Sequence, residues 1–545
     1  MSAQDVEATA SGEESGSKTE LKELRRNFNF WSLCGVGLMT GSTWLPLGGS
    51  IIVVLYNGGA PGAIYELIAT SVFYWMIAAC IAELASAIPS SAGAYNGTVY
   101  HFAAVASGPK HGRVVSWYSG WFNALAWTFG AASVNSVLAN QILTLWGLFH
   151  REYVLRQWHL FVIYLALTWI MTAVVLFCNR ALPLAGDIGA ALIILGFVVV
   201  VVTCAVMPTT TGAGYASSHF VWKDWVNLTG YKSDGFVFLM GMLNGAYAVG
   251  TPDVVTHLAE EIPRPRENVP KAIGIQLSFG FVTAIAFLVT VFYSVHDPTK
   301  LFGEDSSIFP MVDVFLQATG TKAGATALVM IMVVNNLFMG VGVYLTASRI
   351  IWTLARDNAI PFSGAIARIH PRWENPFGAI LVCGGIATVM SFIYLGSSAA
   401  FSAFVGSFVT LTTISYLGAI LPYLVTGRKH VAPGWFRMPR AVFVPAATLA
   451  CAYIIAFVVI FCFPYSQPVA AASMNYTSAI VGGIAVLMGA YWFAMARHRY
   501  KGPGEELLRR IQGINQTVLG EEDRPDLVAG GGARHRVHCH LTSTA

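Results

Sequence analysis

Long apolar runs alternate with short polar connections over most of the chain. Twelve of these runs are long enough to cross a membrane, which takes about 20 consecutive apolar residues in a helix. Their approximate limits are 30–56, 62–88, 114–148, 159–178, 183–207, 235–260, 272–295, 323–354, 377–395, 399–426, 441–463 and 476–496. This pattern predicts an all-α polytopic membrane protein with twelve transmembrane helices.

Polar sequence flanks the apolar region at both ends. Residues 1–27 and 498–545 are rich in charged and small residues, a composition that cannot bury a core. We therefore expect a disordered N-terminal tail over 1–27, a membrane domain over 28–497 and a polar C-terminal tail over 498–545.

The distribution of Lys and Arg predicts the orientation. With the N-terminus in the cytoplasm, 26 of the 32 Lys and Arg residues fall on the cytoplasmic side. Cytoplasmic loops of membrane proteins carry an excess of these residues. Both termini are therefore predicted to be cytoplasmic. The expected location is the plasma membrane, with a vacuolar or other internal membrane as the alternative.

Composition and motifs exclude several functions. Hydrophobic residues make up 55% of the chain and charged residues 11%, whereas soluble domains are about 25% charged. A net charge of +4 without a basic, aromatic-rich stretch excludes nucleic acid as a partner, so the lipid bilayer is the expected environment. No Walker A, HExxH or GxSxG motif is present, so we predict no enzyme activity, no ATP-driven pump, and no metal or cofactor.

Two of the runs contain helix-breaking residues in their middle. The first run places Gly41–Trp44 before Pro46, and the sixth places Asn244–Gly250 before Thr251–Asp253. Thr251 suits the N-cap of a new α-helix, Pro252 its first position and Asp253 its first turn. Interrupted helices at matching positions of two halves are the best sequence indication of a transporter binding site; the alternative is close packing of small residues between helices. The residues expected to bind substrate at the two interruptions are Gly41, Ser42, Thr43, Trp44, Asn244, Tyr247, Gly250 and Thr251.

The interruptions also suggest what binds. N-terminal ends of half-helices favour an anionic group, and C-terminal carbonyls favour a cation, so a zwitterion or an amine suits the site. An aromatic ring attracts an ammonium by about 0.5–2 kcal/mol. Besides Trp44 and Tyr247, the candidate rings are Trp121, Trp127 and Phe404. The alternative role of these rings is ordinary packing or lipid contact.

Ionisable residues are rare within the runs, and such residues are expensive in a membrane unless they serve a function. Among them are Glu66, Glu83, Asp187, Asp253, His257 and Glu260, with Glu261 immediately after the sixth run. Asp253, His257 and Glu261 are spaced i, i+4, i+8, which places them on one face of an α-helix and suggests a proton relay. The alternative is structural, with Asp253 offsetting a helix dipole and Glu261 at the membrane interface. Glu83 and Asp187, near cytoplasmic ends, are predicted gate or anchor residues.

Four stretches resemble a known family. They are GTPDVVTHLAEEIPRPRENVPKAI at 250–273, AELASAIPSSAG at 82–93, GWFNALAW at 120–127 and ARDNAIPF at 355–362. Together they resemble the amino acid–polyamine–organocation superfamily, and among its members the fungal amino acid/choline permeases.

The resemblance implies a five-plus-five inverted repeat over about 30–207 and 235–426, with the first and sixth helices unwound, and two extra helices over about 441–496. It also implies secondary transport of amino acids, GABA, choline or related amines, often driven by a proton gradient. We therefore expect a permease that works by alternating access. The alternative is a membrane nutrient sensor on the same scaffold that binds without transport.

Overall fold

The computed structural model describes residues 29–88, 98–150, 152–301, 307–396, 400–471 and 474–503. The predicted N-terminal tail, nearly all of the C-terminal tail and the end of the motif at 82–93 lie outside these ranges. Within the described ranges the elements are helices, and no β-strand is formed there.

The helices follow the apolar runs. In the first half they are α1 (Phe30–Thr40), α2 (Trp44–Gly49), α3 (Ile51–Tyr56), α4 (Gly59–Ala87), α5 (Val99–Ala106), α6 (Gly108–Phe149), α7 (Gln157–Phe177), η1 (Asn179–Ala181), α8 (Leu182–Thr210) and α9 (Ser218–Trp222). The rest are α10 (Asp234–Val249), η2 (Val254–Glu261), α11 (Pro265–Tyr293), η3 (Pro298–Leu301), α12 (Met311–Thr319), α13 (Lys322–Arg356), α14 (Ser363–Ile366), α15 (Phe377–Ser391), α16 (Ile393–Gly396), α17 (Ala400–Val425), α18 (Arg440–Ile460), α19 (Thr477–Tyr491), η4 (Trp492–Ala496) and α20 (Arg497–Arg499).

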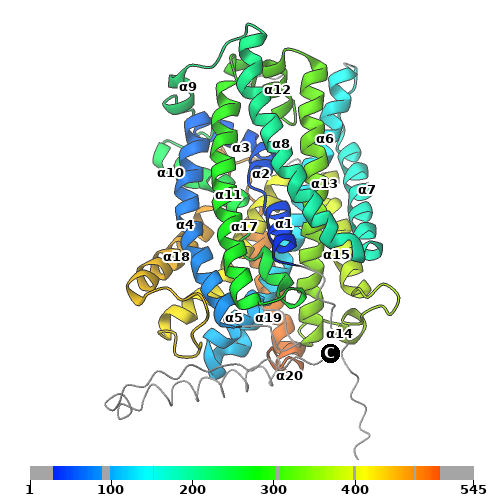
Figure 1. Cartoon of the computed structure of the whole chain (residues 1–545), viewed down its shortest axis with the longest axis vertical. Coiled ribbons are helices and arrows are strands. Elements are labelled where there is room, and N and C mark those ends of the chain that lie inside the picture. The colour runs from blue at the N-terminus through cyan, green and yellow to red at the C-terminus, as the bar shows by residue number, and fades with distance from the viewer. Residues whose placement is uncertain are drawn as a thin grey trace, which may run out of the picture.

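The long helices run side by side along the long axis of the molecule (Figure 1). Nine helices in the described part of the chain are long and apolar enough to cross a membrane. The three other predicted runs correspond to α6, with 42 residues, and to the two interrupted helices α1–α3 and α10–η2. The predicted all-α polytopic fold is confirmed. The repeat relation between the two halves stays a prediction.

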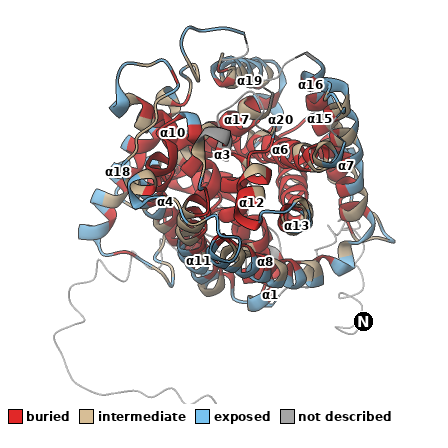
Figure 2. Ribbon diagram, turned by 90° about the horizontal axis from the view of Figure 1, so that it is seen from above, coloured by how far each residue is buried: buried red, intermediate tan, exposed pale blue. Residues whose placement is uncertain are grey.

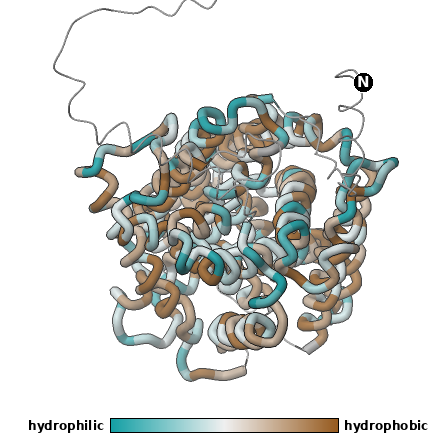
Figure 3. The backbone as a smooth tube through the Cα atoms, turned by 90° about the horizontal axis from the view of Figure 1, so that it is seen from below, coloured by the Kyte–Doolittle hydropathy of each residue, from teal (hydrophilic) through white to brown (hydrophobic). Residues whose placement is uncertain are grey.

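The helices differ in how deeply they are buried. In the apolar part of α17, 78% of the residues are buried. In the span Thr477–Arg499, which begins with α19, only 11% of the residues in the apolar part are buried. Buried residues fill the middle of the bundle and exposed residues line its rim (Figure 2). Hydrophobic residues recur along the outer parts of the chain (Figure 3). Val425 and Val486 are among the large apolar residues that are exposed. A bundle with apolar residues outside and polar groups inside is suited to the hydrocarbon interior of a lipid bilayer.

Candidate functional site

The first interruption lies where the sequence predicts it. Helix α1 ends at Thr40 and α2 begins at Trp44, leaving Gly41–Thr43 between them. Gly41 has no room for a side chain because the amide of Gln276, on α11, occupies that space. Thr43 is anchored to α11, since its hydroxyl donates to the carbonyl of Gly280 at 2.5 Å. The interruption is therefore packed against α11.

The second interruption is shorter than predicted. Helix α10 continues through Asn244 to Val249, and only Gly250–Asp253 separate it from the next helix. The expected α-helical restart with Thr251 as its N-cap is wrong. The segment η2 is a 3₁₀ helix with Asp253 at its N-cap position, and the Asp253 side chain makes no capping bond. That carboxylate is held instead by neighbouring helices, so it cannot fold back onto the first turn of η2.

Gln276 joins the two interruptions. Its Nε2 donates to the carbonyl of Thr251 at 2.9 Å, and Thr251 Oγ1 lies 3.2 Å away. The same amide contacts Gly41. Thr40 Oγ1, Ser42 Oγ and Gln276 Oε1 are buried and have no hydrogen-bond partner among the described residues. The Thr40 hydroxyl faces Gly342 on α13, whereas Ser42 lies within the first interruption and Gln276 packs on Gly41. A buried unpaired polar group costs about 1–3 kcal/mol, so a polar ligand beside Ser42 and Gln276 would offset part of that cost.

Asp253 is held by donors from three elements. Its Oδ2 lies 2.9 Å from Asn123 Nδ2, 3.1 Å from Trp127 Nε1 and 2.9 Å from His257 Nε2, and its Oδ1 accepts from Tyr416 Oη at 2.6 Å. The carboxylate is fully buried. Hydrogen bonds to an ionised group are about twice as strong as neutral ones. Asp253 therefore ties η2 to α6 and α17, and its oxygens are already occupied by protein donors.

Only some of the predicted rings reach the second interruption. Trp127 contacts Asp253, and the Tyr247 hydroxyl lies 2.9 Å from Ser133 Oγ on α6. The other three candidate rings pack elsewhere. Trp44 lies 5.4 Å from the ring of Phe287, Trp121 donates to the carbonyl of Ala359, and Phe404 packs with Phe129, Tyr164 and Tyr394.

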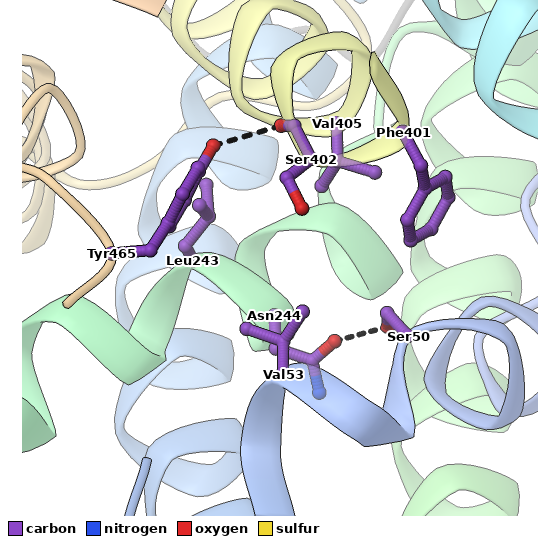
Figure 4. A pocket seen from close by; sticks show the side chains of 8 residues that line it. All are labelled: Ser50, Val53, Leu243, Asn244, Phe401, Ser402, Val405 and Tyr465. Atoms are coloured by element: carbon purple, nitrogen blue, oxygen red, sulfur yellow. Dashed lines mark hydrogen bonds between the residues drawn. The ribbon is translucent and has the colours of Figure 1, made fainter. Parts of the chain in front are cut away.

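A small cavity lies between the outer half-helices and α17 (Figure 4). Ser50 Oγ donates to the side-chain oxygen of Asn244, joining the first and sixth interrupted helices. Tyr465 Oη donates to the carbonyl of Ser402 at 2.9 Å on another wall. The cavity holds about 20 Å³, which is room for about one water molecule. A substrate can pass here only if these helices move apart.

The predicted relay face is only partly formed. His257 contacts Asp253, but Glu261 turns away and pairs with Arg349 Nε on α13 at 3.2 Å. A 3₁₀ helix has three residues per turn, so positions four apart do not line up as they do on an α-helix. The Asp253–His257–Glu261 series is therefore not continuous in this conformation.

The two other predicted acids lie in anchoring contacts. Glu83 accepts from Tyr423 Oη at 2.8 Å and forms an ion pair with Arg428 at 3.3 Å, which ties α4 to the end of α17. Asp187 accepts a hydrogen bond from Ser32 Oγ at 3.1 Å, which ties α8 to α1. Both contacts agree with an anchoring role.

Arg349 organises the end of η2. Besides Glu261, it donates to Asn375 Oδ1 at 3.0 Å and to Asn179 Oδ1 at 3.2 Å, and its side chain is 2% exposed. We expect Arg349→Met to lower the free energy of unfolding by about 3–5 kcal/mol, because a buried carboxylate loses its partner. Thermal unfolding in detergent, followed by tryptophan fluorescence, would measure the fall in Tm.

The exposed Arg368 is the matched control, since Arg368→Met removes the same charge from the surface. Adding Glu261→Gln to Arg349→Met should restore part of the lost Tm, because it removes the unpaired charge. Equal Tm values for Arg349→Met and Arg368→Met would contradict the assignment.

Sequence reasoning missed several residues that shape the site. Gln276, Asn123 and Tyr416 are single polar residues within apolar runs, and nothing local marks them as partners of the interruptions. Arg349 did carry a signal, because a cation inside the eighth run needs a buried acid or a cavity nearby.

The sequence also matches known proteins. Residues 28–486 match the family model described as amino acid permease. The choline transporter of Saccharomyces cerevisiae is 26% identical over 485 residues, which cover 88% of this chain and 82% of the relative. The 7-keto 8-aminopelargonic acid transporter of the same yeast is 25% identical, covering 85% of this chain and 91% of the relative. Amino-acid permease BAT1 of Arabidopsis thaliana is 26% identical, covering 89% of this chain and 95% of the relative.

Proposed function

This chain belongs to the amino acid permease family, and from that premise we propose that it is a secondary transporter that takes up a small amino compound by alternating access, coupled to protons. The substrate is an amino acid, GABA or a choline-like amine. The observation that carries the proposal is the meeting of two helix interruptions at Gln276, whose Oε1, like the Ser42 hydroxyl in the first interruption, has no hydrogen-bond partner among the described residues. The proposed membrane is the plasma membrane, with both termini in the cytoplasm.

The substrate lies between the two interruptions in this proposal. Gly41–Thr43 supply backbone and hydroxyl groups on one side, and Gly250 and Thr251 supply them on the other. Asp253 already has protein donors on both oxygens. The substrate ammonium is therefore held by backbone carbonyls at the interruptions and by nearby rings such as Tyr247. Such a site accepts an ammonium without a dedicated counterion.

Alternating access follows from the closed outer cavity. The cavity beside Ser50 and Asn244 holds about 20 Å³, whereas small-ligand pockets hold several hundred. Entry from outside requires α2 and α10 to separate from α17. Exit to the cytoplasm requires the anchors at Glu83 and Glu261 to shift.

Uptake into liposomes tests the proposal. The purified protein is reconstituted, and uptake of labelled amino acids, GABA, choline and polyamines is measured with and without an inward proton gradient. We expect concentrative uptake of at least one amino compound, abolished by a protonophore. Specific binding of a compound without uptake would instead identify a sensor, and uptake unaffected by the proton gradient would reject the coupling.

A further inference from the structure

Glu66 is an acid in the membrane region that takes no part in the contacts of the candidate site. It lies on α4, two turns from the start of that helix, and is 1% exposed. Neither carboxyl oxygen has a hydrogen-bond partner among the described residues. An ionised carboxylate buried in this way would be extremely costly. Glu66 therefore carries a proton in this conformation.

The other acids at membrane depth whose side chains are described behave differently. Asp253 accepts from several donors, Glu83 pairs with Arg428, Glu261 pairs with Arg349, and Asp187 accepts from a serine. Their partners favour the ionised form. Among these acids Glu66 alone is placed to gain and lose a proton as its surroundings change.

The Glu66 carboxyl rests directly on a helix that must move. It packs against Gly241 of α10, where even a methyl group would overlap the carboxyl. One turn further, Thr70 Oγ1 lies 3.3 Å from the carbonyl of Met242, and Thr70 also fills the space beside Gly245. Gly241 thus covers this carboxyl and Gly245 packs on Thr70 one turn further along α10, the outer half of the interrupted sixth helix.

No ion pair or hydrogen bond reaches the Glu66 carboxyl from the helices packed on α4 in the described structure. Helices α3 and α17 carry no Asp, Glu, Lys, Arg or His, and on α5 His101 lies 3.7 Å from Asp357. On α10, Asp234 lies seven residues from Gly241 and accepts from Asn227 at 2.9 Å. On α9, His219 is paired with Asp224. On α11, Lys271 and Glu267 pair with each other in the first two turns, and on α18 Arg440 is the first residue. Hydration alone therefore sets whether Glu66 is ionised.

We propose that Glu66 is the proton-binding site that couples transport to the proton gradient, an inference that rests on the proposed function. When α10 parts from α4, water reaches the carboxyl and it exchanges its proton with the side that is open. When α10 closes on α4 in the substrate-loaded carrier, the dry carboxyl must be protonated, so the loaded carrier crosses with one proton. After substrate and proton leave, water in the vacant site hydrates the carboxylate, and the empty carrier returns without a proton. One proton is bound as the carboxylic acid and later released to water, which leaves the carboxylate.

The test compares Glu66→Gln with the parent protein in liposomes clamped at zero membrane potential. Gln keeps the shape of the neutral acid but binds no proton. For one coupled proton, a gradient of two pH units drives about hundredfold accumulation. We expect accumulation by Glu66→Gln to fall to about one, substrate-induced proton influx to vanish, and exchange of internal for external substrate to persist.

Glu267→Gln is the matched control, because it neutralises a partly exposed acid in the first turn of α11. It should accumulate substrate like the parent. Glu66→Asp, which keeps the titratable group, should retain proton influx. Full accumulation and proton influx by Glu66→Gln would overturn the assignment while leaving transport intact. Proton influx in Glu66→Gln without substrate exchange would also overturn the assignment of Glu66. A parent protein that transports none of the compounds would instead reject the proposed function itself.

Discussion

Asp253→Asn is expected to abolish transport and to destabilise the protein. The carboxylate oxygens lie against side-chain nitrogens of Asn123, Trp127 and His257 and the hydroxyl of Tyr416. An amide presents only one acceptor oxygen, and its NH₂ group would face donors. Each buried donor left unpaired costs about 1–3 kcal/mol. Uptake should fall by at least about a hundredfold. This fall in rate corresponds to a rise of only about 2.7 kcal/mol in the activation free energy.

The measurement combines initial uptake rate in liposomes with Tm in detergent. Asp187→Asn is the matched control, since that acid has a single described hydroxyl partner and lies between α1 and α8. It should retain most of the uptake and of the Tm. Normal uptake by Asp253→Asn would remove the carboxylate from any essential role in holding η2 to α6 and α17.

Gly250→Leu is expected to abolish uptake while leaving the protein in the membrane. A Cβ at position 250 would overlap the carbonyl oxygen of Ala246 and lie 3.4 Å from Tyr74 Oη. The carbonyl of Gly250 accepts from Tyr416 Oη at 3.1 Å, so displacing this backbone also disturbs α17. Overpacking a buried site costs about 1–3 kcal/mol, which a large bundle can tolerate, whereas the distorted interruption can no longer hold a substrate.

Substrate binding and uptake should both be measured, together with the amount of protein at the membrane. Gly482→Leu on the peripheral helix α19 is the control, because a Cβ there meets no atom within 4 Å in the described structure. Uptake by Gly482→Leu should equal that of the parent. If Gly250→Leu transported normally, the second interruption could not be part of the substrate site.

Much of the architecture could be predicted because the hydrocarbon interior of a membrane offers the backbone no hydrogen-bond partners. Each apolar run must satisfy its backbone hydrogen bonds internally, so it becomes a helix. The first interruption, predicted at Gly41–Trp44, forms at Gly41–Thr43 with Trp44 as the first residue of α2, since successive small and helix-capping residues weaken the helix there. Trp127 and Asp253 were both candidates, and the structure brings them into contact.

Other features depend on contacts between distant segments. The pattern after Gly250 matches an α-helical N-terminus, but tertiary hydrogen bonds from α6 and α17 draw the Asp253 side chain away from that role. The resulting 3₁₀ helix breaks the predicted alignment with Glu261. The bridging by Gln276 could not be found either, because a lone glutamine in an apolar run has no local signature of its partner.

The two ends of the bundle are closed by chemically different contacts. At the end of Ser50 and Asn244 the contact is a neutral hydrogen bond, whereas at the other end Glu83–Arg428 and Glu261–Arg349 are buried ion pairs. Hydrogen bonds to charged groups contribute about 1.5–3 kcal/mol each, against about 0.5–1.5 kcal/mol for neutral ones. In the proposed alternating-access cycle and the predicted orientation, this difference would favour an empty carrier that rests with its inner end closed and its outer end more easily opened. Such a resting bias presents an unloaded site to the medium, which suits a carrier that scavenges a scarce nutrient.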